Sequence, residues 1–183
     1  DEAMLFAPLL APAELVPIRA AATSPTLRAL LELFWTLRRV EVTRACWADV
    51  NLSDGTMRVI RKGGRATWTL LRPETQVALA EWFVVAGQPP DARPIFPGRR
   101  GGPMSPHGLG GLVRRVLRRA GVYRRWRGAH AWRRTLATRY MEQNPGDAEG
   151  LAKLLGHASV STTFLYNYVQ PADLRPRLDR VRL

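Results

Sequence analysis

Apolar side chains recur at helical spacing in the first part of the chain. Ser24 followed by Pro25 is typical of a helix start, because serine caps the first turn and proline suits its first position. The buried face of this predicted helix consists of Leu27, Leu30, Leu31, Phe34 and Leu37. A short helix is predicted next, over residues 40–45.

The pattern then changes to alternation between polar and apolar positions. Asp54 with Gly55, and Gly63 with Gly64, are turn signals between such segments. We therefore predict a small antiparallel sheet of three strands at about 47–52, 56–62 and 65–71. Lys62 lies at the tip of the second turn.

Helical patterns return in the second half of the chain. A helix is predicted from Pro73 to Gly87, followed by a loop rich in proline and glycine. Further helices are predicted over 107–122, 130–144, 148–155 and 162–168. This order of helices, sheet and helices predicts an α+β fold that is mainly α, in a single domain over residues 1–183.

Length and composition agree with one folded domain. The chain has 183 residues, 46% of them hydrophobic, and no apolar run long enough to span a membrane. Its start lacks a basic secretory leader, and the first residue is Asp1 rather than Met, which indicates a fragment or a processed form. Cys46 is the only cysteine, so an internal disulfide is excluded and a cytoplasmic protein is expected.

Charge points to a polyanionic partner. The formal net charge is +13 and the isoelectric point about 11.4, which favours nucleic acid. All but two of the 28 basic residues are arginine, the exceptions being Lys62 and Lys153. A site that needs a cationic proton donor would have to use lysine, because arginine keeps its proton. The candidates for contact with a nucleic-acid backbone are Arg114, Arg115, Arg118, Arg119, Arg124, Arg125 and Arg127.

Metal chemistry finds little support in the residues. The three histidines form no close pair, and one cysteine makes no zinc cluster. Glu41, Asp49 and Asp54 form no clear ligand set, although a two-metal carboxylate site stays open at this point. We expect no metal and no cofactor.

Metal-free phosphoryl transfer requires a nucleophile, cations for the transition state and an acid for the leaving oxygen. His130 and Arg133 share a helix face, since they are three residues apart. Tyr166 and Tyr168 point about 200° apart on a helix, so only one of them can face a given site. Taken singly, each of these residues is more often a packing or surface residue.

In combination and in this order, several segments resemble the tyrosine recombinases, also called the phage integrase family. "FWTLRRVEVTRACWADV" resembles the segment with the first catalytic arginine, and "VIRKGGRATWTLL" the hairpin with the catalytic lysine. "HAWRRTLATRYMEQN" resembles the His-x-x-Arg helix. "LAKLLGHASVSTTFLYNYV" resembles the Leu-Gly-His turn and the nucleophile helix. The resemblance covers roughly residues 9–170.

The resemblance implies a role for each group. Tyr166 would attack the scissile phosphate and form a 3′-phosphotyrosyl link, while Lys62 would protonate the 5′-oxygen leaving group. His130 would act as acid or base near the tyrosine, and His157 would donate a hydrogen bond to the phosphate. The phosphotyrosyl link conserves the bond energy for rejoining, so no cofactor is implied.

The resemblance also implies that Arg38 and Arg133 bind the non-bridging phosphate oxygens, with Glu41 in support. The sequence departs from the family pattern at Thr36, where glycine is usual, and at Trp132 and Arg134, where Leu and His are common. These departures put local packing in question, not the catalytic groups.

The expected function is that of the catalytic domain of a site-specific DNA recombinase, cytoplasmic and nucleoid-associated. The expected partners are double-stranded DNA with a specific site and other subunits in a synaptic tetramer, with no membrane. The family's N-terminal DNA-clasping domain is expected to be absent from this chain, and residues 171–183 are expected to form a tail that packs in cis, docks in trans or is mobile. The alternatives are a type IB topoisomerase and a catalytically silent DNA-binding regulator.

Overall fold

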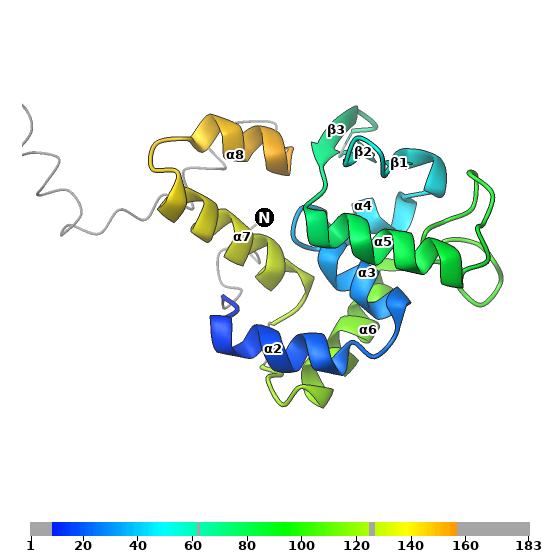
Figure 1. Ribbon diagram of the computed structural model, residues 1–183, viewed down its shortest axis with the longest axis horizontal. Coiled ribbons are helices and arrows are strands. Elements are labelled where there is room, and N and C mark those ends of the chain that lie inside the picture. The colour runs from blue at the N-terminus through cyan, green and yellow to red at the C-terminus, as the bar shows by residue number, and fades with distance from the viewer. Residues whose placement is uncertain (1–8, 62, 125–126, 157–183) are drawn as a thin grey trace, which may run out of the picture.

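The computed structural model describes residues 9–61, 63–124 and 127–156, in which a small sheet lies at one edge of a mainly helical fold (Figure 1). The helices are α2 (Pro12–Ala21), α3 (Pro25–Leu33), α4 (Arg39–Arg44), α5 (Pro73–Val85), α6 (Pro106–Arg119), α7 (Ala129–Gln143) and α8 (Ala148–Leu155). The strands are β1 (Val50–Asn51), β2 (Thr56–Ile60) and β3 (Ala66–Leu70). This confirms the predicted fold class, α+β and mainly α.

The sheet has the predicted antiparallel order β1-β2-β3. Its first strand is shorter than predicted, because Trp47–Asp49 form a 3₁₀ helix, η1, instead of extended chain. The cause is local: the Asp49 carboxylate accepts a hydrogen bond from the backbone N–H of Cys46 at 3.0 Å and caps the turn. The backbone N–H groups of Trp47 and Ala48 donate to the carbonyls of Arg93 and Asp91, which holds η1 against the loop at residues 91–93.

The main core forms where the predicted apolar face of α3 packs against its neighbours. The Ser24 hydroxyl accepts a hydrogen bond from the Leu27 N–H at 3.2 Å, which confirms the predicted helix start. Leu30, Phe34 and Leu37 are fully buried, although the last two follow the end of α3. The rest of the main core includes Leu79, Ile95, Leu109, Val113, Leu117 and Trp132.

A second, smaller core joins α7 to α8. It consists of buried apolar residues from both helices, namely Ala137, Met141, Ala148, Leu151 and Leu155. The C-terminal end of α8 then meets the edge strand β3, where the Thr69 hydroxyl donates a hydrogen bond to the carbonyl of Leu154 at 2.8 Å. Helix α8 therefore connects α7 to the sheet (Figure 1).

The start of the described chain is tied to α7. The backbone N–H of Leu10 donates to the Thr135 hydroxyl at 2.8 Å, and the Thr135 side chain is buried. None of the helices within the described ranges combines the length and the apolar character that crossing a bilayer requires.

Candidate active site

A buried carboxylate lies at the start of α4. The side chain of Glu41 is 4% exposed, and its Oε2 accepts a hydrogen bond from the backbone N–H of Arg38 at 2.7 Å. Its Oε1 accepts from Nη1 of the Arg38 guanidinium at 3.0 Å. The helix thus begins with an acid at its third position that caps the backbone and also holds the preceding arginine side chain.

A second arginine reaches the same carboxylate from the hairpin. Met57 and Val59 point inward from β2, and Arg61 continues this alternation just past the end of the strand. Its side chain is 7% exposed, and its Nη1 lies 3.0 Å from Glu41 Oε2. Its Nε donates to the Thr67 hydroxyl at 2.9 Å, which ties the guanidinium to the returning strand.

A third arginine comes from α7. Arg133 is 1% exposed, and its guanidinium donates hydrogen bonds to the carbonyls of Thr36, just before Arg38, and Leu155, at the end of α8. Thr36 is buried, and so is Trp132, the residue that precedes Arg133 in the chain. Two of the departures from the family pattern are therefore accommodated inside the protein.

The charges around Glu41 keep it ionised. Burial raises the pKa of this carboxyl, but Arg61, the backbone N–H of Arg38, Arg133 and the Arg38 side chain together outweigh burial and hold the pKa below its ordinary value. A buried carboxylate is costly unless it is paired and hydrogen-bonded, and here it is both.

His130 lies on the same face of α7 as Arg133 and is half-buried. Burial lowers the pKa of its imidazole, and the positive charges of Arg39, Arg133 and Arg38 lower it further. The side chain is therefore neutral near neutral pH. A neutral imidazole can accept a proton, as a general base must.

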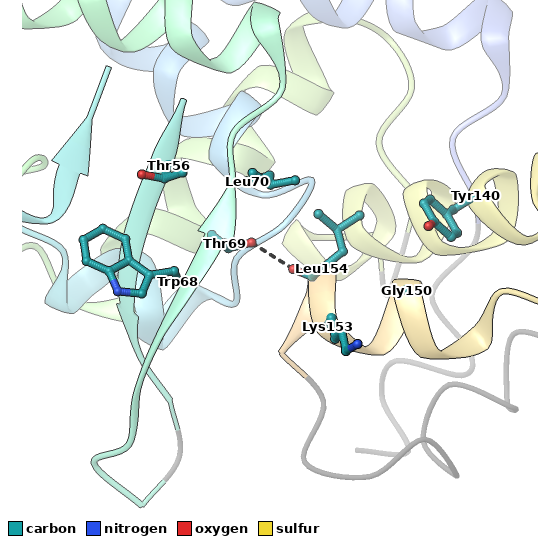
Figure 2. Close-up of a pocket in the computed structure, with 8 residues that line it drawn as sticks. All are labelled: Thr56, Trp68, Thr69, Leu70, Tyr140, Gly150, Lys153 and Leu154. Carbon is teal, nitrogen blue, oxygen red and sulfur yellow. Dashed lines mark hydrogen bonds between the residues drawn. The ribbon is translucent and has the colours of Figure 1, made fainter. Parts of the chain in front are cut away.

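The last turn of α8 is held by three different elements. Leu154 accepts from Thr69 of β3, as Figure 2 shows, and Leu155 accepts from Arg133 of α7. Gly156 has a left-handed backbone, with φ of +61°. A Cβ added there would lie 2.3 Å from Cζ and Nε of Arg61, so the guanidinium occupies the space that a side chain would fill.

A cavity of about 340 Å³ opens beside this junction, between β3 and α8. Its wall is largely apolar and includes Trp68, Leu70 and Leu154, with Tyr140 and Lys153 at its edge (Figure 2). The arginines and the glutamate described above do not line it. This cavity is therefore separate from the charged cluster.

Comparison with known protein families identifies the family of this chain. The family model described as "Phage integrase family" matches residues 12–173. This chain belongs to the phage integrase family.

Relatives within the family include tyrosine recombinases. The chain is 34% identical over 144 residues to the tyrosine recombinase XerC of Xylella fastidiosa (strain 9a5c), covering 78% of this chain and 48% of that protein. It is 31% identical over 144 residues to the XerC of Pelobacter propionicus, covering 78% and 47%. The chain thus spans about half the length of the curated relatives it matches.

Solved structures of family members share the fold. The XerA recombinase superposes with a TM-score of 0.77 at 23% identity, covering 96% of this chain and 66% of that one. The XerH recombinase bound to its difH substrate before cleavage superposes with a TM-score of 0.75 at 24% identity, covering 94% and 54%.

The structure brings four of the residues expected from the family together. Arg38, Glu41, His130 and Arg133 come from α7 and from the start of α4, and their charges interact. Lys62, His157, Tyr166 and Arg125 lie outside the described residues, so their predicted roles stay predictions. Within the described ranges, His, Cys, Asp and Glu form no group of three or more that could hold a metal ion.

Arg61 was not among the residues predicted from the family motifs. A signal was available: the alternation of β2 puts residue 61 on the same face as Met57 and Val59, and an arginine that faces inward requires an acidic partner. The partner, Glu41, lies in another element, and the pattern of one strand does not reveal it.

The candidate DNA-contacting arginines differ in their surroundings. Arg115 and Arg118 are exposed on α6, with Arg118 stacked 4.9 Å above the ring centre of Tyr123. Arg119 is also exposed, although its Nη1 donates to Thr23 at 3.1 Å. Arg114 is half-buried, and Arg124 is exposed.

Arg127 departs from the prediction that it contacts DNA. Its side chain is 2% exposed and pairs with Glu14 at 2.6 Å, and it also donates to the carbonyls of Val122 and Leu9. This direct pairing with the carboxylate of Glu14 neutralises the charge of Arg127 and favours a structural role over a phosphate contact. Arg127 instead holds α2 against the segment that precedes α7.

Gly156→Ala is expected to destabilise the protein by about 1–3 kcal/mol, because the left-handed backbone is strained for alanine and the new methyl group meets Arg61. Gly121→Ala is the matched control, since Gly121 also has a positive φ, of +71°, but open space around it. Urea unfolding of both variants measures the difference. Equal losses would show that the Arg61 contact contributes nothing.

Proposed function

We propose that this chain is the catalytic domain of a site-specific DNA recombinase. The observation that carries the proposal is the convergence of Arg38 and Arg133 on one buried carboxylate, with His130 in the field of both arginines, in a chain that belongs to the phage integrase family. Two arginines of fixed charge suit the non-bridging oxygens of a phosphodiester.

In the proposed reaction, Tyr166 attacks the scissile phosphorus. The bond from phosphorus to the tyrosyl oxygen forms, and the bond from phosphorus to the 5′-oxygen breaks. The tyrosine proton passes to His130, whose lowered pKa leaves it free to accept. Lys62 donates a proton to the departing 5′-oxygen, and His157 donates a hydrogen bond to the phosphate. Reversal with another 5′-hydroxyl rejoins the strand.

Arg38 and Arg133 are proposed to stabilise the charge that develops on the phosphate. Their positions are set before DNA binds, because Glu41 holds the Arg38 side chain and two backbone carbonyls hold Arg133. Groups that are already oriented need no reorganisation during the reaction, which is the main source of electrostatic catalysis.

The proposed partners are duplex DNA with a specific site and further subunits in a synaptic tetramer, which would place the protein at the nucleoid. Solved recombinase structures with the same fold include DNA complexes, such as XerH with difH and a lambda integrase dimer on a core site. In this chain the exposed arginines of α6 support a phosphate-contacting face. Arg114 and Arg39 both approach Gly110, which links that face to the charges around His130.

Replacing Arg115 and Arg118 together by glutamine is expected to weaken DNA binding and its salt dependence. Each lost phosphate contact lowers the slope of log affinity against log salt by about 0.9, so a decrease of up to about 2 is expected. Fluorescence anisotropy between low and high salt measures it. The control replaces Arg28 and Arg93, two exposed arginines outside α6. Equal effects of the two pairs would contradict a role for α6.

The function is tested by trapping its covalent intermediate. The protein as encoded by its gene is incubated with nicked duplex fragments of its source genome, in which the short strand beyond the cleavage point dissociates and prevents rejoining. Adducts that withstand SDS are isolated and their DNA is sequenced. We expect a small set of related sequences, with the protein joined to a 3′-phosphate.

The two alternatives predict different results from those of a recombinase. A type IB topoisomerase would relax supercoiled plasmid and show little sequence preference in its adducts. A silent regulator would bind DNA and form no adduct. A plasmid with two copies of the recovered sequence, assayed for deletion or inversion of the DNA between them, separates a recombinase from both.

A further inference from the structure

We propose that Arg61 is a positioning residue for DNA cleavage, which couples the hairpin that carries Lys62 to the Arg38–Glu41 pair and to the end of α8. It directly precedes Lys62 in the chain. The expected changes in cleavage rate rest on the proposed function, whereas the contacts of Arg61 rest on the structure alone.

The first contact links Arg61 to Arg38 through Glu41. The two oxygens of this carboxylate are shared, because Oε1 accepts from Arg38 Nη1 while Oε2 lies 3.0 Å from Arg61 Nη1. A shift of the hairpin therefore moves the carboxylate that holds Arg38 in place. Geometry of this kind matters for rate, since misplacement of a catalytic group by about 1 Å can cost about 100-fold.

The second contact links Arg61 to Gly156, the residue before His157. The guanidinium lies directly over the Gly156 Cα, where no side chain intervenes. Thr69 of the same hairpin also holds Leu154, while Arg133 holds Leu155. Arg61 thus completes a set of three contacts on consecutive residues, of which two come from the hairpin.

Stability alone does not account for this arrangement. Arg61 Nη2 is buried and has no hydrogen-bond partner within residues 9–61, 63–124 and 127–156, and such a donor is unfavourable. Among the described residues, the carboxylate of Glu41 and the hydroxyl of Thr67 are the groups that compensate the buried guanidinium. What the residue contributes is a fixed spatial relation among hairpin, α4 and α8.

The test compares two variants. Arg61→Met keeps a long side chain and removes the charge, whereas Arg61→Lys keeps the charge and loses the forked guanidinium. Arg58→Met is the matched control, since Arg58 lies on the same hairpin and also pairs with a buried acid, Asp49, at 2.9 Å. Hydrogen exchange is measured without DNA. We expect faster exchange at the amides of Arg38 and Gly156 in Arg61→Met and unchanged exchange there in Arg58→Met.

Cleavage is then measured on the nicked duplex recovered above, at saturating DNA. We expect Arg61→Met to slow adduct formation about 100-fold while DNA affinity stays within about twofold, and Arg61→Lys to restore part of the rate.

The two proposals fail separately. If the wild-type protein forms no adduct with any DNA, the proposed function is wrong. The hydrogen-exchange experiment still tests the contacts of Arg61 in that case. Unchanged protection at Arg38 and Gly156 in Arg61→Met overturns the coupling. Equal cleavage rates for Arg61→Met and the wild type, on a substrate that the wild type cleaves, overturn the role in positioning.

Discussion

Tyr166→Phe is expected to abolish the SDS-stable adduct with DNA, because the substitution removes the oxygen that is proposed to form the phosphotyrosyl bond. Phenylalanine keeps the ring, so folding and DNA affinity should stay close to those of the wild type. The proposed reaction has a single nucleophile, and the expected loss is therefore complete, in contrast to the partial losses that follow from misplaced cations.

Tyr168→Phe is the control for this experiment. It removes the same hydroxyl two residues away, on a side chain that points about 200° from Tyr166 if the segment is helical. We expect it to form the adduct at a rate near that of the wild type. An adduct in Tyr166→Phe that disappears in Tyr168→Phe would assign the nucleophile to the other tyrosine.

Glu41→Gln is expected to destabilise the folded protein by about 3–5 kcal/mol, which is the usual loss when one partner of a buried ion pair is removed. Glutamine has nearly the same shape, so the effect measures charge: Arg61 and Arg38 lose the carboxylate that both contact. Urea unfolding at pH 7 gives the free energy. Glu81→Gln, which breaks the exposed pair with Arg28, should cost about 1 kcal/mol or less.

The same variant has a definite pH dependence. The pKa of Glu41 is lower in the folded protein than its ordinary value of 4.5, so its contribution to stability is fully present above that value. The contribution is lost as pH falls through the lower folded pKa. The stabilities of wild type and Glu41→Gln should therefore converge in acid. A constant difference from pH 7 down to pH 2 would contradict the ionised state of Glu41.

Much of the fold could be predicted because its signals are local. Ser24 and Pro25 set the start of α3, Gly156 marks the end of α8, and alternation marks β2 and β3. The first strand was predicted too long, because the capping of η1 by Asp49 competes with extended chain and alternation does not report it.

Part of the site could be predicted because some of its residues lie in short local motifs. Arg38, Glu41, His130 and Arg133 belong to short motifs that carry the family resemblance. The positions of Arg61 and Arg127 depend on Glu41 and Glu14, each of which lies in a different element from the arginine it pairs with. A basic residue looks the same in sequence whether it meets solvent or a buried acid, and only tertiary packing separates the two cases.

The separation of the site's parts along the chain also bears on the order in which it folds. Arg38 and Glu41 are three residues apart, whereas Arg133 meets Thr36 across 97 positions and Thr69 meets Leu154 across 85. Local contacts close with less loss of entropy than distant ones. During synthesis, Arg38 is thus neutralised early by its own helix, and the cluster is completed only after α8 has left the ribosome. A nascent chain therefore lacks the assembled cluster until synthesis has passed α8.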